Sequence, residues 1–150
     1  MLLLERVRAA LDPGDCILLG VDLVKDEAVL QAAYDDAAGV TAAFNRNVLV
    51  RLNRELDADF NPATFGHRAV WNAADSRMEM HLVSAKDQEV WLPAIDLRVK
   101  FKVGESIHTE NSYKYRSGEA ETLLSKAGFA PEATWTDERG WFAVCLARVR

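Results

Sequence analysis

Residues 104–115, GESIHTENSYKY, place a side chain that can exchange protons or hydrogen bonds at nearly every second position. In an extended strand successive side chains point to opposite faces, so residues two apart share a face. One face would carry His108, Glu110, Ser112 and Lys114, and the other Ile107, Thr109, Asn111, Tyr113 and Tyr115. A face this polar is either solvated, as one face of an antiparallel sheet commonly is, or it binds a polar ligand.

The other residues with reactive side chains argue against two kinds of site. His67, His81 and His108 are far apart in the sequence and lack the paired spacing that is typical of a metal site, so we expect no metal. Nothing beyond the presence of the residue types suggests a Ser/His/Asp or Cys/His arrangement. We therefore do not expect a hydrolase.

Composition restricts the partners and the compartment. The chain has 150 residues and a formal net charge of -5, and its basic residues are scattered, so we expect no nucleic-acid or anionic-membrane surface. The opening MLLLERVRAAL is too short and too charged for a signal peptide, and no stretch approaches the roughly 20 apolar residues of a membrane span. Cys16 and Cys145 lie in apolar runs, as small buried thiols do, which predicts a reducing, cytoplasmic compartment.

The first third of the chain has the pattern of an α/β protein. Apolar residues recur at helical spacing from Leu4 to Leu11, before the DPGD turn. In residues 16–23, CILLGVDL, apolar side chains occur at both odd and even positions and so on both faces of a strand, which predicts a strand covered on both faces. Asp36 or Thr41 is suited to cap the second of the helices that follow. These helices are expected over residues 27–33 and about 40–56.

The middle of the chain alternates in the manner of β structure. DADFNPATF ends the long helix, and five candidate strands follow: HRAVWNA, RMEMHLVSA, QEVWLP, LRVKFKV and the stretch 104–115. ADSR and AKD are suited to hairpin turns after the first and the second of them. We expect an antiparallel unit of about 50 residues.

The last third returns to helix and then closes with a hairpin. Ser117 is the expected N-cap of a helix with Leu123 and Leu124 facing inward, and Gly128 before Phe129 its C-cap. Residues 131–136 pair with residues 141–149 through DERG, in which Gly140 supplies a left-handed residue. Residues 141–149 are apolar on both parities, so they belong between the other arm and residues 16–23.

Residues 16–23 are then left with one open edge. An apolar strand with an unpaired edge favours pairing with another chain. We therefore expect a further segment before Met1 to complete the sheet, and self-association of the chain through this edge without it.

Three stretches resemble, nearly residue for residue, the histidine-specific methyltransferase family: LLGVDLVKD, AAYDDAAGVTAAFNRNVLVRLNRELDADF and GESIHTENSYKY. The similarity covers essentially the whole chain, but only the C-terminal half of a family member. The family uses S-adenosylmethionine to trimethylate the α-amine of L-histidine, giving hercynine in ergothioneine biosynthesis. The resemblance implies an α/β fold: the C-terminal part of a Rossmann-like methyltransferase sheet at residues 1–56 and 117–150, with an inserted, mainly antiparallel substrate-recognition subdomain at residues 57–116.

The resemblance also implies roles for single residues. A tyrosine at the position of Tyr34 helps to hold the substrate carboxylate, and a glutamate and a serine matching Glu110 and Ser112 hold the imidazole. A neutral imidazole has one nitrogen that donates and one that accepts. Two residues at i and i+2 of a strand lie roughly 6.5–7 Å apart, so their side chains can converge on opposite sides of one ring.

Four further positions carry weaker implications. Thr41 and Phe44 match residues near the amine and methyl end of the family's pocket, and Met80 matches one that flanks the imidazole. Asn111 points away from Glu110 and Ser112 in a regular strand, so its part in substrate binding is limited to its backbone or to supporting the strand. Packing is the alternative explanation for three of them. Thr41, Asn45, Val48 and Leu52 fall on one helical face, and Met80 shares a strand face with Met78 and Leu82.

The cofactor is expected to bind elsewhere. In this class S-adenosylmethionine sits on a glycine-bearing turn after the first strand, whereas Gly20 lies inside a strand pattern and makes no G-x-G-x-x-G. The resemblance thus implies the half of a methyltransferase that recognises L-histidine or its methylated forms, inactive without the N-terminal half. The alternative is a non-catalytic ligand-binding or assembly module that keeps this fold.

Overall fold

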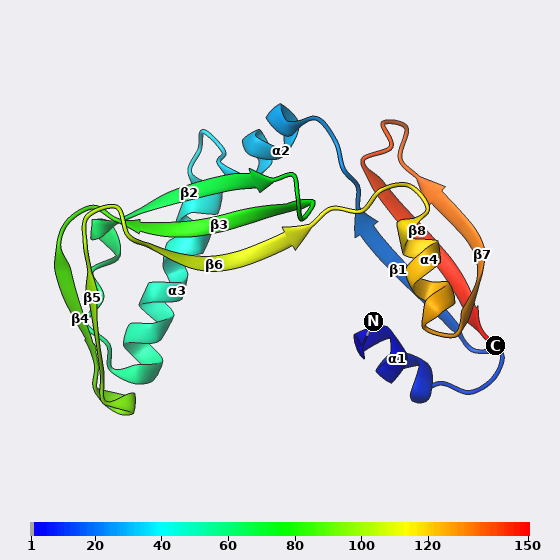
Figure 1. The fold of residues 1–150 in the computed structure, drawn as a ribbon, viewed down its shortest axis with the longest axis horizontal. Helices are drawn as coiled ribbons and strands as arrows, with labels where there is room; N and C mark the ends of the chain where they lie inside the picture. The colour runs from blue at the N-terminus through cyan, green and yellow to red at the C-terminus, as the bar shows by residue number, and fades with distance from the viewer. Residues whose placement is uncertain (1) are drawn as a thin grey trace. The chain divides into compact units, whose positions relative to one another are not determined.

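Three sheets, together with four α-helices, build residues 2–150, the part of the chain that the computed structural model describes (Figure 1). The helices are α1 (Leu2–Ala9), α2 (Glu27–Tyr34), α3 (Val40–Leu56) and α4 (Glu119–Lys126). The strands are β1 (Cys16–Asp22), β2 (Phe65–Asn72), β3 (Arg77–Ser84), β4 (Gln88–Leu92), β5 (Leu97–Phe101), β6 (Ser106–Tyr113), β7 (Phe129–Thr136) and β8 (Phe142–Val149). Short 3-10 turns cover Pro62–Thr64 and Pro93–Ile95.

The chain divides into two compact units. One unit, the terminal unit, contains residues 1–25 and 113–150, and the other, the middle unit, contains residues 26–112. The middle unit begins at Asp26 because α2 and α3 both pack on its sheet. Among residues 2–150 no helix is long and apolar enough to span a membrane.

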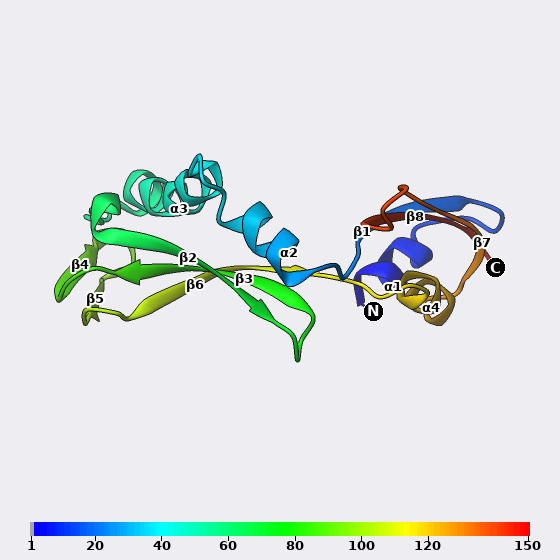
Figure 2. The same ribbon diagram turned by 90° about the horizontal axis from the view of Figure 1, so that it is seen from above.

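The terminal unit is an antiparallel sheet of order β1-β8-β7 with α1 and α4 on the same face (Figure 2). The predicted central place of β8 is therefore confirmed. Every second residue of β8 from Ala143 to Val149 is buried against Leu124 and Phe129, because the alternation of the strand directs these side chains to the helices. Burial of such side chains supplies the main stabilisation of a unit this small.

The opposite face of this sheet is open among the residues described. Leu18 is 65% exposed, and Trp135 and Phe142 are also largely exposed, so the prediction that β1 is covered on both faces is wrong for this chain. The reason is that both helices of the unit pack on one side. β1 pairs only with β8 in the described sheet, and its other edge is open as expected, apart from one parallel bridge between Leu23 and Tyr115 beyond its end.

Lys114 does not belong to the polar face of β6. The strand ends at Tyr113, and the ammonium of Lys114 is fully buried in the terminal unit, 2.8 Å from Oδ2 of Asp22. Lys25 approaches the other oxygen of the same carboxylate at 2.5 Å. The predicted row of four polar side chains is thus wrong at its last position, because a buried ammonium requires an anionic partner and Asp22 supplies one.

The carboxy-terminal turns follow the expected chemistry with one exception. Gly128 after α4 and Gly140 in the β7–β8 hairpin have φ of 90° and 63°, the left-handed conformation predicted for both. Ser117 is not the N-cap of α4. Gly118, with φ of 84°, takes that position without a side-chain hydrogen bond, and Glu119 accepts instead from the backbone N–H of Arg116.

The middle unit carries α2 and α3 on one face of the sheet β2-β3-β6 (Figure 2). The hairpin predicted at ADSR joins β2 to β3, and β6 runs antiparallel to β3 (Figure 1). The hairpin predicted at AKD does not form. The end of β3 pairs with the start of β6, since Ser84 N–H donates to Glu105 and Gly104 N–H donates to Ser84, and β4 pairs with β5 in a separate ribbon.

Helix α3 has the predicted bounds, but its N-cap residue is Gly39, with φ of 71° and no side-chain cap hydrogen bond, and neither Asp36 nor Thr41 takes that position. The carboxylate of Asp36 accepts the backbone N–H groups of Val40 and Thr41 at 2.9 and 2.8 Å, and these bonds lower its pKa to about 2. The buried stripe of α3 differs from the predicted one, because Asn45 and Leu49 are buried whereas Val48 is 41% exposed. Leu49 belongs to one apolar cluster with Phe65, whose ring meets those of Phe60 and Phe101 edge to face.

Candidate functional site

Tyr34 and Ser112 lie side by side although 78 positions separate them. Tyr34 is the last residue of α2, Ser112 stands near the end of β6, and their hydroxyl oxygens share a hydrogen bond of 2.6 Å. Both side chains are half-buried. The structure therefore joins two of the residues that the sequence assigns to the substrate.

Glu110 and Asn111 lie next to this pair along the chain, and both are exposed. Burial alternates from Ile107 to Glu110, as in a regular strand, and the alternation breaks at Asn111. His108 stacks on His81 on the sheet face away from the helices, whereas Ser112 contacts Tyr34 of α2, so the prediction that His108 and Ser112 share one face is wrong. A carboxylate in this position is accessible to a ligand and can accept a hydrogen bond from it. The polar end of β6 thus offers an acceptor at Glu110 and, two residues further on, the hydroxyl of Ser112.

The three weaker candidates Met80, Thr41 and Phe44 differ in how deeply they are buried. Met80 is buried beneath the helices with Met78 and Leu82, which is the packing role considered for it. Thr41 is half-buried at the start of α3, with its hydroxyl 3.5 Å from the carbonyl of Ala33, the residue before Tyr34. Phe44 is 63% exposed on the outer side of α3, so it is not part of the buried stripe.

His67, which the sequence left out of the site, contacts the backbone of Tyr34, and Asn45 contacts His67 in turn. His67 of β2 approaches the carbonyl of Tyr34 through Nε2 at 2.8 Å, and Asn45 of α3 contacts Nδ1 of the same ring at 3.0 Å. No local signal singles out either residue. The predicted stripe of α3 already contains the polar Thr41, and the partners of Asn45 and His67 are distant along the chain.

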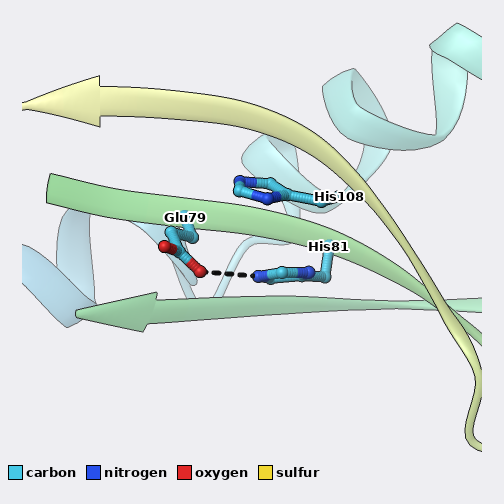
Figure 3. Close-up of side chains that lie close together, drawn as sticks. All are labelled: Glu79, His81 and His108. Atoms are coloured by element: carbon cyan, nitrogen blue, oxygen red, sulfur yellow. Dashed lines mark hydrogen bonds and ion pairs between the residues drawn. The ribbon is translucent and has the colours of Figure 1, made fainter. Parts of the chain in front are cut away.

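The other face of the sheet β2-β3-β6 holds a cluster that sequence spacing did not reveal. Figure 3 shows the rings of His81 and His108 one above the other, with a centroid distance of 4.5 Å, and the carboxylate of Glu79 directed at His81. Glu79 Oε2 lies 3.2 Å from His81 Nε2. The two histidines come from β3 and β6, which are neighbours in the sheet, so residues 27 positions apart become adjacent.

Charge in this cluster is already balanced within the protein. Hydrogen bonds from Asn72 and Arg77 lower the pKa of Glu79 to about 2, so its carboxylate is ionised at neutral pH. Burial lowers the pKa of His81 below its usual value, although the hydrogen bond with Glu79 acts in the opposite direction. His81 is therefore neutral at pH 7.

The cluster is not a formed metal centre. One potential ligand atom from each of Glu79, His81 and His108 lies within 4.8 Å of the others. Imidazole lone pairs lie in the ring plane, however, and stacked rings do not aim them at a common point, so His108 would have to rotate to share an ion. The guanidinium of Arg77, 2.7 Å from Glu79, adds repulsion of any cation.

Comparison with known sequences places these residues in a class of enzymes. The fold is mixed α/β with antiparallel sheets, and the sequence model of a family of methyltransferases that depend on S-adenosylmethionine matches residues 1–149. The chain belongs to that family, the histidine-specific SAM-dependent methyltransferases.

Named relatives support the same assignment. The chain is 49% identical over 144 residues to the histidine N-alpha-methyltransferases of Mycolicibacterium smegmatis and Mycobacterium tuberculosis, covering 96% of this chain and 45% of each relative. It is 28% identical over 146 residues to ergothioneine biosynthesis protein 1 of Neurospora crassa, covering 93% of this chain and 16% of that protein. The chain thus spans less than half the length of these relatives.

Proposed function

We propose that this chain is the substrate-recognition half of a methyltransferase that transfers methyl groups from S-adenosylmethionine to the α-amine of L-histidine. The observation that carries the proposal is the 2.6 Å contact between Tyr34 and Ser112. The family resemblance assigns the first residue to the substrate carboxylate and the second to its imidazole, and their contact makes one continuous site of them.

The exposed end of β6 supports a specific mode of recognition. A neutral imidazole donates from one nitrogen, for which Glu110 is an acceptor, and accepts at the other, for which the hydroxyl of Ser112 is a donor. Tyr34, beside Ser112, then lies towards the carboxylate end of the amino acid. With the ring and the carboxylate both held, the α-amine is oriented towards the methyl donor, and orientation supplies most of the rate in such a reaction.

The cofactor is assigned to the amino-terminal half that the relatives possess. S-adenosylmethionine supplies the electrophilic methyl group, and the described residues do not fit it. Gly20 lies in the middle of β1, and a Cβ there would meet Cζ of Phe142 at 2.8 Å, so this glycine makes room for an aromatic ring of its own sheet.

The same proposal extends to the architecture and the compartment. We propose that the terminal unit is the end of a Rossmann-like sheet whose remaining strands pair with β1. The open edge of β1 and the exposed Leu18 support this. The middle unit would then be the substrate-recognition subdomain of a cytoplasmic enzyme.

A non-catalytic assembly module is the second candidate function. The observation that favours it is the exposed apolar stripe of Val40, Phe44 and Val48 on α3, since exposed apolar patches commonly mark interfaces. Calorimetry of the chain with L-histidine and with S-adenosylmethionine separates the two. Tight binding of the cofactor to this chain alone would overturn the assignment of the cofactor to the other half.

The test of histidine recognition uses a joined protein, meaning this chain expressed behind the amino-terminal half of the Mycolicibacterium smegmatis relative. Glu110→Ala removes a charged acceptor, so kcat/KM for L-histidine should fall by about 10-fold to 150-fold, which corresponds to about 1.5–3 kcal/mol. For a substrate with an apolar aromatic ring, Glu110→Ala should lower kcat/KM by a smaller factor. Ser112→Ala should act in the same direction by about 0.5–1.5 kcal/mol.

Glu138→Ala is the matched control, because Glu138 is an exposed glutamate in the β7–β8 turn. It should leave kcat/KM unchanged. If Glu110→Ala left the preference for histidine over the apolar substrate unaltered, the polar face of β6 would be merely solvated.

A further inference from the structure

We propose that His67 and Asn45 are positioning residues, which hold Tyr34 and the end of β6 at a fixed separation and so set the affinity for the amino-acid substrate. The inference rests on the proposed function for the identity of that substrate. Neither residue needs to touch the substrate, because both act through a chain of hydrogen bonds that runs from α2 through β2 and α3 to β6.

The chain of bonds is continuous and short. His67 Nε2 lies 2.8 Å from the carbonyl oxygen of Tyr34, and His67 Nδ1 lies 3.0 Å from Nδ2 of Asn45. Thr109 donates from its hydroxyl to Oδ1 of Asn45 at 2.7 Å. One end is thus the last residue of α2, and the other is the residue directly before Glu110.

The donors and acceptors of this hydrogen-bond network determine one another. A carbonyl oxygen only accepts, so His67 carries its proton on Nε2 and donates it to Tyr34. Its Nδ1 is then an acceptor, which Asn45 satisfies with one amide N–H while the other donates to the carbonyl of His81 at 3.2 Å. Oδ1 of Asn45 remains as the acceptor for Thr109, so every polar atom of the buried amide is used.

The bond to Tyr34 helps to anchor the C-terminal end of α2. The last four carbonyls of an α-helix have no partner within the helix, and the carbonyl of Tyr34 is one of them. His67 ties it to β2, and Gln31, one turn earlier, donates to the carbonyl of Ala69 on the same strand at 3.2 Å. These two bonds fix the backbone from which the phenol of Tyr34 extends to Ser112.

The bond to Thr109 fixes the other side of the site. The hydroxyl of Thr109 is shared between Asn45 and the carbonyl of Met80, at 2.7 and 2.9 Å, so it holds β6 against both α3 and β3. Glu110 directly follows Thr109, and Ser112 is the third residue after Thr109. The network therefore sets the distance between the residue assigned to the carboxylate and those assigned to the imidazole.

Two substitutions of His67 separate positioning from general stability. Glutamine places its amide nitrogen near the position of Nε2, so His67→Gln can still donate to Tyr34. Asparagine is shorter, so His67→Asn keeps a polar partner for Asn45 and loses the reach to Tyr34. Both are neutral amides of similar character at a half-buried site, which makes them a matched pair.

In the joined protein, His67→Asn should raise KM for L-histidine by roughly 2-fold to 13-fold, the range for one neutral hydrogen bond. KM for S-adenosylmethionine should stay within about twofold, and His67→Gln should restore most of the affinity for histidine. The inference is overturned if the two variants have the same KM for histidine, or if His67→Asn raises both KM values equally.

A second measurement on the 150-residue chain does not depend on the substrate. Nitrogen-15 NMR should report a protonated Nε2 and an unprotonated Nδ1 for His67, and nuclear Overhauser contacts between the Tyr34 ring and Ser112 should persist in His67→Gln and weaken in His67→Asn. If these contacts respond in this way and the joined protein does not methylate histidine, the proposed function fails and the positioning role stands. If the contacts are equal in both variants, the positioning role fails.

Discussion

Replacing Lys114 by methionine should destabilise the terminal unit measurably at neutral pH. The ammonium of Lys114 has no exposed surface and lies 2.8 Å from Asp22, whose side chain is 32% exposed. Removing one partner of a fully buried ion pair costs about 3–5 kcal/mol, because the remaining charge is left without compensation. Asp22 retains Lys25 and partial contact with water, so the loss here should be closer to that of one charged hydrogen bond, about 1.5–3 kcal/mol.

The assay is urea unfolding of the chain at pH 7, followed by circular dichroism. Lys126→Met is the control, because Lys126 is exposed in the last turn of α4, and surface substitutions usually change stability by less than about 0.5 kcal/mol. Asp22→Asn leaves the ammonium groups of both Lys114 and Lys25 without their carboxylate, so it should cost at least as much as Lys114→Met. Equal stability of Lys114→Met and Lys126→Met, or an Asp22→Asn variant as stable as the unmodified chain, would refute the reasoning.

Three other outcomes follow from the structure. Stability should fall on acidification: Glu79, with a pKa of about 2, contributes stability above its ordinary value of 4.5 and loses it as pH falls towards 2, and Glu79→Gln should flatten this part of a pH titration of unfolding. The chain should associate through the β1 edge and the face with Leu18, so sedimentation should show dimers or larger species that Leu18→Lys reduces, and a monodisperse monomer at high concentration would count against this. The purified chain should transfer no methyl group to L-histidine, and any turnover would contradict the assignment of the cofactor to the other half.

Local signals in the sequence predicted where helices and strands begin and end far better than they predicted which strands pair. Helix α3 was predicted with its observed bounds because Asp36 accepts backbone N–H groups of its first turn and DADFNPATF cannot continue a helix. The order β1-β8-β7 followed from the apolar residues on both faces of residues 141–149. The AKD turn was assigned wrongly because turn propensity is local, whereas the second partner of β3 is β6, which begins at Ser106, 22 positions after Ser84.

The site was predictable only in part, and for a similar reason. Tyr34, Glu110 and Ser112 came from a long sequence match, but nothing in the sequence placed Tyr34 against Ser112. Lys114 followed the alternation of a strand that ends one residue before it. Asn45 and His67 carry no local signal of function, since their roles depend on hydrogen bonds between α2, α3 and two strands that are distant along the chain.

The central claim is that this chain selects L-histidine for methylation at its α-amine. The most direct measurement is mass spectrometry of L-histidine incubated with S-adenosylmethionine and the joined protein. We predict successive addition of up to three methyl groups at the α-amine, with the imidazole unmodified. A joined protein that folds and binds S-adenosylmethionine but leaves L-histidine unmethylated, or methylates its ring, would contradict the account.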